Sequence, residues 1–392
     1  MSRPDLSFIK TQGGLGRPLA GKDHYSGLIV YSDTASPFPS SATTIQIASL
    51  KGLEDAGVSA DDSDFKYLHY HVSEFFRANP KGILWVKIEP VPATPASRTF
   101  VEIDALQQFS GGVIRQVAVF DDVAAFDYTQ LTTIQSVVDG LAAIKMPLSV
   151  VVGSDISGVS DSSTLPDLRS LNAPAVSVCI AESGSVRAQT LKTALGKSLT
   201  SVGNLLGIIS LAKVSDNIAY PEKFQIDGGG ELVDALLANG TNIKDIDPSN
   251  LDAIHDKGYI LPRQFVDIAA TYYTDSPTAV SITSDFAYIE NNRTLDKAIR
   301  NVRTQVQKKL NSKIKIEADG TIAPDIIGMF KSETGKPLQD MQNNDEISAY
   351  RVDIDPTQDV LATSKIEIAI TIIPFGTARE IVYNIGFAKT LS

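Results

Sequence analysis

Five short apolar runs in the first half of the chain restrict its fold more than any other feature. They are rich in valine and isoleucine, and several are nearly continuous: residues 25–31, 83–88, 114–120, 148–152 and 175–180. Strands of a parallel sheet have this pattern because helices bury both of their faces. Segments with apolar residues at helical spacing separate the runs, at 65–78, 128–144 and 186–199. The alternation predicts an α/β fold with a mostly parallel, doubly wound sheet.

The last third of the chain follows a different pattern. Five apolar residues at steps of three and four form one stripe, which predicts a helix over 292–312. Asp319-Gly320 is a turn signal, and residues 347–354 have the composition of a strand. These signals predict an α+β unit joined to the first sheet. We divide the chain into an N-terminal arm (1–20), an α/β domain (21–257), a C-terminal domain (258–378) and a C-terminal arm (379–392).

Both ends of the chain resemble strands that lack an internal partner. Ile381, Tyr383, Ile385 and Phe387 alternate with other residues at the period of a half-buried strand. At the other end, Phe8 and Ile9 lie in a glycine-bearing segment that is too short for a domain. An open strand edge exposes backbone groups that recruit other chains. The two ends therefore suggest strand addition to neighbouring molecules, although a disordered N-terminal tail is an equally good reading of the first twenty residues.

Composition excludes several classes of protein. A single cysteine, Cys179, rules out an internal disulfide and a multi-cysteine metal site. The net charge of −11 argues against a general nucleic-acid binder, which needs a surplus of lysine and arginine. No apolar run reaches the roughly 18 residues of a membrane span, and the start of the chain has no signal-peptide pattern. We expect synthesis in the cytoplasm, no membrane insertion and no direct contact with nucleic acid.

The motifs that would carry catalysis are incomplete. Asp33, Asp121 and Asp155 each follow a predicted strand, so they would lie at the carboxyl edge of the sheet, where doubly wound folds bind ligands. A magnesium-dependent enzyme or binding domain that uses these carboxylates is the alternative hypothesis. Aspartate after a strand is also an ordinary turn residue. The four histidines form no ligand set, and we expect them to be partly exposed structural residues. No cofactor is predicted.

One charged segment contrasts with the acidic background. The predicted helix carries Arg293, Lys297, Arg300 and Arg303, followed by two further lysines, and Asp296 is its only acid. A solvated helix face is the simpler interpretation. The other is docking to an acidic surface, which in an acidic protein could belong to another copy of the same chain.

The order of elements near the C-terminus resembles one known family. Residues 288–300 lead into a long helix, and the strand at 347–354, the segment 360–365 and the closing strands follow. This series is similar to the C-terminal domain of contractile tail sheath proteins, which form the outer tube of phage tails and related injection systems. The N-terminal arm and the strand at 27–31 match more loosely, and residues 90–249 match no pattern of the family.

The resemblance implies a structural subunit without an active site. Sheath subunits lend terminal arms to the sheets of neighbouring copies, surround an inner tail tube protein, meet baseplate and terminator proteins, and contract. Here the arms would use Phe8, Ile9, Ile381, Tyr383, Ile385 and Phe387. Contacts with the tube or with neighbours would use Arg293, Lys297, Arg300, Arg303, Lys331 and Lys336. The protein would belong to a phage tail or to an injection particle assembled in the bacterial cytoplasm. A weaker hypothesis is that the chain is another assembly protein, such as a baseplate component.

Overall fold

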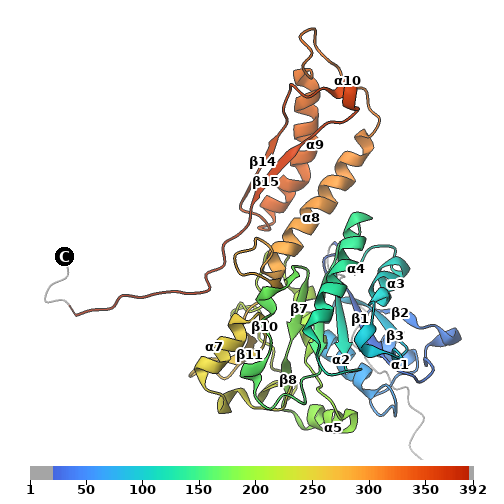
Figure 1. Cartoon of the computed structure of the whole chain (residues 1–392), viewed down its shortest axis with the longest axis vertical. Helices are drawn as coiled ribbons and strands as arrows, with labels where there is room; N and C mark the ends of the chain where they lie inside the picture. The colour runs from blue at the N-terminus through green and yellow to red at the C-terminus, as the bar shows by residue number, and fades with distance from the viewer. Residues whose placement is uncertain (1–20, 388–392) are drawn as a thin grey trace, which may run out of the picture. The chain divides into compact units, whose positions relative to one another are not determined.

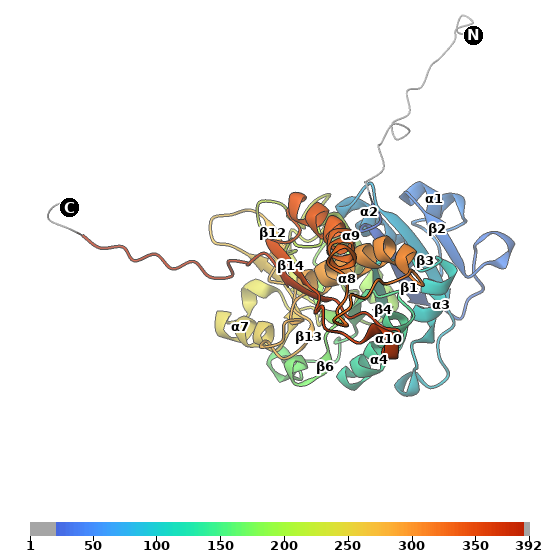
Figure 2. The same ribbon diagram turned by 90° about the horizontal axis from the view of Figure 1, so that it is seen from above.

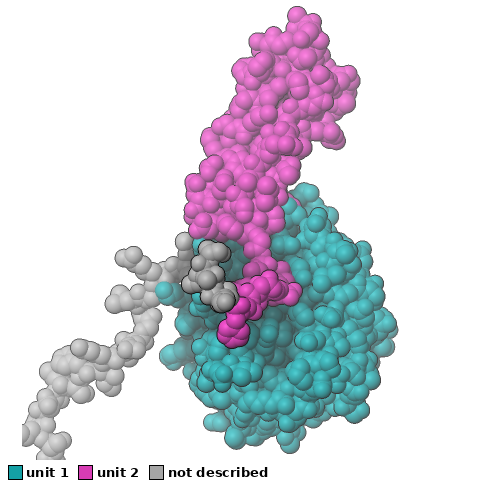
Figure 3. Space-filling model, turned by 90° about the vertical axis from the view of Figure 1, so that its left-hand side faces the viewer, with its two compact units in different colours: residues 1–296 teal, residues 297–392 magenta. Residues whose placement is uncertain are grey.

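The computed structural model describes residues 21–387 and divides the chain into two compact units (Figure 3). Unit 1 ends at Asp296, and unit 2 begins at Lys297. The division falls inside helix α8 (Ile289–Val306), so this helix contributes to both units.

Unit 1 is built on a seven-stranded sheet in the order β10-β7-β5-β4-β1-β3-β2 (Figure 1). The strands are β1 (Tyr25–Tyr31), β2 (Thr44–Ile47), β3 (Ile83–Glu89), β4 (Gln116–Asp121), β5 (Ser149–Ser154), β7 (Val176–Cys179) and β10 (Tyr259–Ile260). Every neighbouring pair is parallel except β2 and β3. The predicted α/β class, the mostly parallel sheet and all five predicted strands are confirmed.

Alternate residues of each strand enter two separate cores, one on each face of the sheet. Leu28 and Val30 belong to the first core, whereas Ile29 and Tyr31 belong to the second. The helices that cover the first face are α1 (Leu50–Asp55), α2 (Lys66–Ala78), α5 (Val186–Leu195) and α6 (Val202–Leu211). Those on the second face are α3 (Val101–Phe109), α4 (Leu131–Ala143) and α7 (Pro248–Asp256). Burial on both faces explains why the strand sequences lack polar alternation.

Helix α6 is central to the first core, and it packs very closely on α2. A Cβ atom at Gly203 would lie 2.4 Å from the carbonyl oxygen of His71, and one at Gly207 would lie 2.7 Å from that of Phe75. Only glycine allows this approach of the two backbones. Residues 202–210 are all buried, so the helix has no polar face that would reveal its period in the sequence.

Short antiparallel pairs complete unit 1. They join β8 (Ala181–Ser183) to β9 (Ala235–Leu237), β11 (Pro262–Gln264) to β12 (Thr271–Tyr273), and β6 (Asn172–Ala173) to β13 (Ala279–Val280). Strand β10 adds to the main sheet beside β7, and β13 pairs with β6. Residues 258–296 therefore pack with unit 1, and the structural division lies later in the chain than the domain boundary placed after residue 257.

Unit 2 contains a helical pair and a hairpin. Helix α8 leads to α9 (Pro324–Asn343), and the hairpin joins β14 (Ala349–Asp353) to β15 (Ala369–Ile373), with α10 (Val360–Thr363) between them. Its hydrophobic cluster is small and has four buried members, Ala298, Leu338, Met341 and Ile347. Ile322, Ala323 and Phe330 are also buried in this unit. The short 3-10 helices of the chain are Pro39–Ser41, Pro95–Ser97, Tyr128–Gln130, Ser162–Thr164, Leu168–Ser170, Ile243–Asp245 and Gln307–Lys309.

Candidate assembly surfaces

The carboxyl edge of the large sheet is filled by the protein's own side chains. Strands β1 and β4 are neighbours, but the chain continues from β1 toward β3 and from β4 toward β5, which makes their junction the usual ligand crevice of such folds. Here Arg98 donates two hydrogen bonds to Asp121, Nη1 to Oδ1 at 2.8 Å and Nη2 to Oδ2 at 2.7 Å. The same guanidinium lies 4.7 Å from the ring centroid of Phe100 and 5.5 Å from that of Tyr31.

The three aspartates of the metal hypothesis have separate structural roles. Burial raises the pKa of Asp121, and the ion pair with Arg98 opposes that shift. Asp155 accepts hydrogen bonds from the backbone of Ser157 at 3.1 Å and of Ser198 at 3.0 Å. Asp33 accepts one from the backbone of Val91 at 3.2 Å. Among residues 21–387 no three His, Cys, Asp or Glu side chains are grouped so that they could hold a metal ion. The metal hypothesis thus has no geometric support in the described chain.

Asp122 and His71 are two further titratable groups beside this edge whose pKa values are strongly shifted. Burial raises the pKa of Asp122 to about 7, and its Oδ1 has no hydrogen-bond partner in the described chain. His24 and His69 are each 4% exposed and His71 is 0% exposed, so the expectation of partly exposed histidines was wrong for three of the four. His71 is the most deeply buried of them. Its ring lies 4.3 Å from that of Phe120, and burial lowers its pKa to about 3. It is a neutral core residue, because its ring is fully buried and packs on Phe120 of β4.

The hairpin of unit 2 has two open edges. Strands β14 and β15 pair antiparallel from Ala349 opposite Ile373 to Asp353 opposite Ala369, and no further strand joins them in the described chain. A groove of about 610 Å³ runs between α9 and β14. Three consecutive β14 residues, 350–352, line it together with Lys331, Gly335, Gln339 and Gln342 of α9. Successive strand side chains point to opposite faces, so a groove that touches all three runs along the strand edge.

Residues 374–387 form no strand, so the second closing strand predicted from the sequence does not form within the described part of the isolated chain. This segment follows β15. Its side chains are almost fully accessible: Ile381 is 66% exposed, Tyr383 78% and Ile385 94%. Figure 2 shows residues 374–387 as an extended trace. A strand needs a partner for its backbone groups, and this segment finds none among the described residues. Phe8 and Ile9 lie outside the described residues.

The six basic residues considered for contacts fall into different environments. Arg293 is 4% exposed and donates to the carbonyl oxygens of Ala212 and Lys213, both at 3.3 Å. Lys297 pairs with Glu346 at 2.5 Å. Arg303, Lys331 and Lys336 are exposed, whereas Arg300 is half-buried. Arg293 is therefore buried and not available for contacts with another molecule. Its guanidinium instead holds the start of α8 against the end of α6.

Two family models match most of the chain. A model described as the DUF2586 N-terminal domain matches residues 3–277, and one described as the DUF2586 C-terminal domain matches residues 285–392. The chain belongs to the DUF2586 family. No curated protein sequence matches it.

Solved structures similar to this DUF2586 protein come from contractile assemblies. A chain of the anti-feeding prophage baseplate has a TM-score of 0.61 at 14% identity, with 99% of both chains covered. A chain of the PVC extracellular contractile injection system, from its contracted sheath complex, has a TM-score of 0.60 at 12% identity and 98% coverage of both. The sheath tail protein Lin1278 of Listeria innocua has 0.52 at 12%, covering 91% of this chain and 96% of its own.

These matches confirm, at the level of fold, the resemblance to sheath proteins that the sequence suggested. Their near-complete coverage includes residues 90–249, where the sequence pattern matched nothing. The similar structures are components of multisubunit contractile assemblies. Within the described residues, no helix is both long and apolar enough to cross a membrane.

Proposed function

We propose that this DUF2586 protein is the structural subunit of a contractile sheath. Copies polymerise around an inner tube by exchanging terminal strands, and the assembled sheath contracts to drive the tube through a target envelope. The observation that carries the proposal is the accessible, alternating segment 381–387 in a chain whose hairpin β14–β15 has two open edges. The fold shared with sheath chains supports it.

Strand exchange would give hydrogen-bond partners to the backbone groups of both copies. An added strand supplies backbone hydrogen bonds to an open edge, while its alternate side chains determine the register. The hairpin has apolar residues to cover, since Ile370 is 38% exposed and Ile373 57%. Burying one large apolar side chain contributes about 1.5–3 kcal/mol, so Ile381, Tyr383, Ile385 and Phe387 together could exceed the cost of association. The Phe8 and Ile9 segment would serve the same purpose at the other end.

Such links suit a lattice that moves. Backbone strands hold neighbouring copies together while the bodies rotate, and free energy stored during assembly is released when the baseplate triggers contraction. The partners would be other copies, the inner tail tube protein, and baseplate and tail terminator proteins. Arg300, Arg303, Lys331 and Lys336 would contact the tube or neighbouring copies. The particle would be a phage tail or a contractile injection system made in bacteria.

Truncation tests the proposal directly. We expect a chain that ends at Arg379 to remain folded, because no described core residue follows it, and to form no tubes by negative-stain electron microscopy. A full-length variant with Ile381, Tyr383 and Ile385 changed to serine should fail in the same way. Its control changes Val382, Asn384 and Ala378 to serine, which alters the other face of the proposed strand. Tubes formed by the truncated chain would refute the arm assignment.

A baseplate-associated subunit is the second candidate, because one of the similar chains belongs to a baseplate. Electron microscopy distinguishes the two. A sheath subunit forms tubes of many stacked layers, whereas a baseplate component stops at a single ring.

A further inference from the structure

The charge of the chain is divided very unevenly between its units. Residues 1–296 contain 22 lysines and arginines against 34 acids, a net charge of −12, whereas residues 297–392 contain 13 against 12. Within unit 2, residues 297–315 include seven basic residues and no acid. Like charges on such a segment repel one another, and an acidic surface that contacts it would relieve that repulsion.

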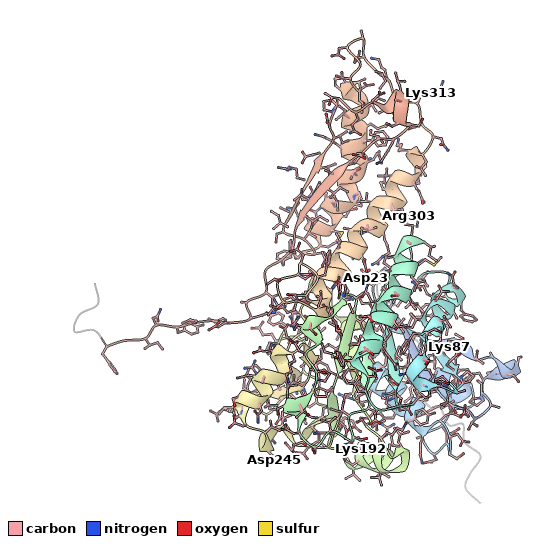
Figure 4. All side chains as sticks on the ribbon, viewed as in Figure 1. Asp23, Lys87, Lys192, Asp245, Arg303 and Lys313 are labelled. Carbon is pink, nitrogen blue, oxygen red and sulfur yellow. The ribbon has the colours of Figure 1, made fainter. Side chains whose placement is uncertain are left out.

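Only part of this segment is neutralised within the chain. Lys297 pairs with Glu346, and Lys315 pairs with Glu317 at 2.9 Å. Arg303, Lys308 and Lys313 are exposed, and none of the three has an ion-pair partner among residues 21–387. Figure 4 shows Arg303 on α8 and Lys313 in the loop beyond it. We call these three residues the basic tip.

The helix dipole does not account for the basic tip. Cations stabilise the last turn of a helix, and Arg303 lies in the last turn of α8. That effect fades within one turn, whereas Lys313 follows the end of α8 and the 3-10 helix Gln307–Lys309. The charge of Lys313 is therefore available to an acidic surface outside the unit.

Unit 1 carries charge of the opposite sign. Around α7, Asp245, Asp247, Asp252 and Asp256 are exposed, and no lysine or arginine occurs within residues 245–256. We propose that the basic tip of one copy docks on the acidic unit 1 surface of another copy. The inference rests on the proposed assembly of many copies and adds to it a second, electrostatic contact that is separate from strand exchange. Such contacts guide association and weaken with salt.

Carbodiimide cross-linking of the full chain tests the contact. The reagent joins a lysine amine to a carboxylate that it touches, so it reports the partner without a prior choice of acidic residue. With an equal mixture of isotope-labelled and unlabelled copies, we expect peptides that link Lys308 or Lys313 of one isotope to a carboxylate within residues 21–296 of the other. Links to an added inner tube protein, with none between copies, would overturn the proposal, and so would the absence of any link.

Charge reversal supplies the matched comparison. The variant Arg303→Glu, Lys308→Glu, Lys313→Glu should lower the apparent association constant about tenfold or more at low salt, since each exposed ion pair has a modest effect. The control Lys22→Glu, Lys81→Glu, Lys145→Glu makes the same change in net charge at exposed sites of unit 1 and should assemble better than the tip variant. Equal assembly of the two variants would contradict the proposal. If tubes form but no cross-links between copies are found, only the contact of the basic tip is refuted. If cross-links between copies form but tubes do not, only the sheath assignment is refuted.

Discussion

Burial of His71 makes the stability of the protein depend on pH. Its pKa is lowered to about 3 in the folded state, against an ordinary value of 6.5. As the pH falls below 6.5, the unfolded chain binds a proton that the folded chain excludes, so stability is lost between pH 6.5 and about 3.

We expect His71→Leu to remove this loss. Between pH 7 and pH 5 the free energy of unfolding of the wild-type protein should fall by about 2 kcal/mol more than that of the variant. Urea denaturation at the two pH values measures the difference. The variant His255→Gln removes a half-buried histidine and serves as the control. Parallel pH profiles for His71→Leu and wild type would contradict the account.

The pH dependence of stability that we expect from Asp122 has the opposite sign to that from His71. Burial raises its folded pKa from 3.8 to about 7, so its contribution to stability is complete below pH 3.8 and is lost as the pH rises toward 7. Asp122→Asn keeps the shape but cannot ionise. At pH 8 the variant should be more stable than wild type by about 4 kcal/mol, and at pH 4 the gain should nearly vanish. A gain that is equal at both pH values would show that ionisation is not its cause.

At the scale of elements, the α2–α6 contact determines the first core. Gly203→Ala would place a Cβ atom 2.4 Å from the carbonyl oxygen and 2.8 Å from the Cα atom of His71, and neither backbone atom can move without shifting α2. We expect a loss of about 3 kcal/mol in the free energy of unfolding. Gly140→Ala is the matched control, because nothing lies within 4 Å of its added Cβ on α4, so it should gain up to about 1 kcal/mol. Equal effects of the two changes would disprove the close packing.

The elements differ in how clearly the sequence reveals them. Strands β1 and β3 to β5 were predicted because sustained valine and isoleucine runs fit little else. Helix α6 was missed because it is buried all round, and α9 because Pro337 and two glycines interrupt its pattern. Residues 381–387 have a strand pattern but form no strand, since a strand depends on a partner that the sequence of one copy does not position. The three aspartates were correctly predicted to lie at strand ends. Arg98, which pairs with Asp121, comes from a loop whose sequence has no pattern that would predict this ion pair.

On the scale of the whole molecule, the proposed function depends on contacts between copies. Unit 1 has two cores and a filled ligand crevice, which suits a rigid body. Unit 2 has a small core, two open strand edges and an exposed terminal segment, which suits a connector. This contrast, together with the fold shared with contractile assemblies, is the basis of the proposed sheath.

The most direct test joins the arm of one copy to the hairpin of another. Tyr383→Cys is mixed with Arg351→Cys, on β14, or with Thr371→Cys, which lies opposite it on β15. The native Cys179 is buried and should contribute little background. Under assembly conditions, a short bismaleimide should give a covalent dimer of Tyr383→Cys with at least one hairpin variant, and mass spectrometry should locate the link between the two copies. Assembled tubes in which neither pair forms a cross-link would contradict strand exchange.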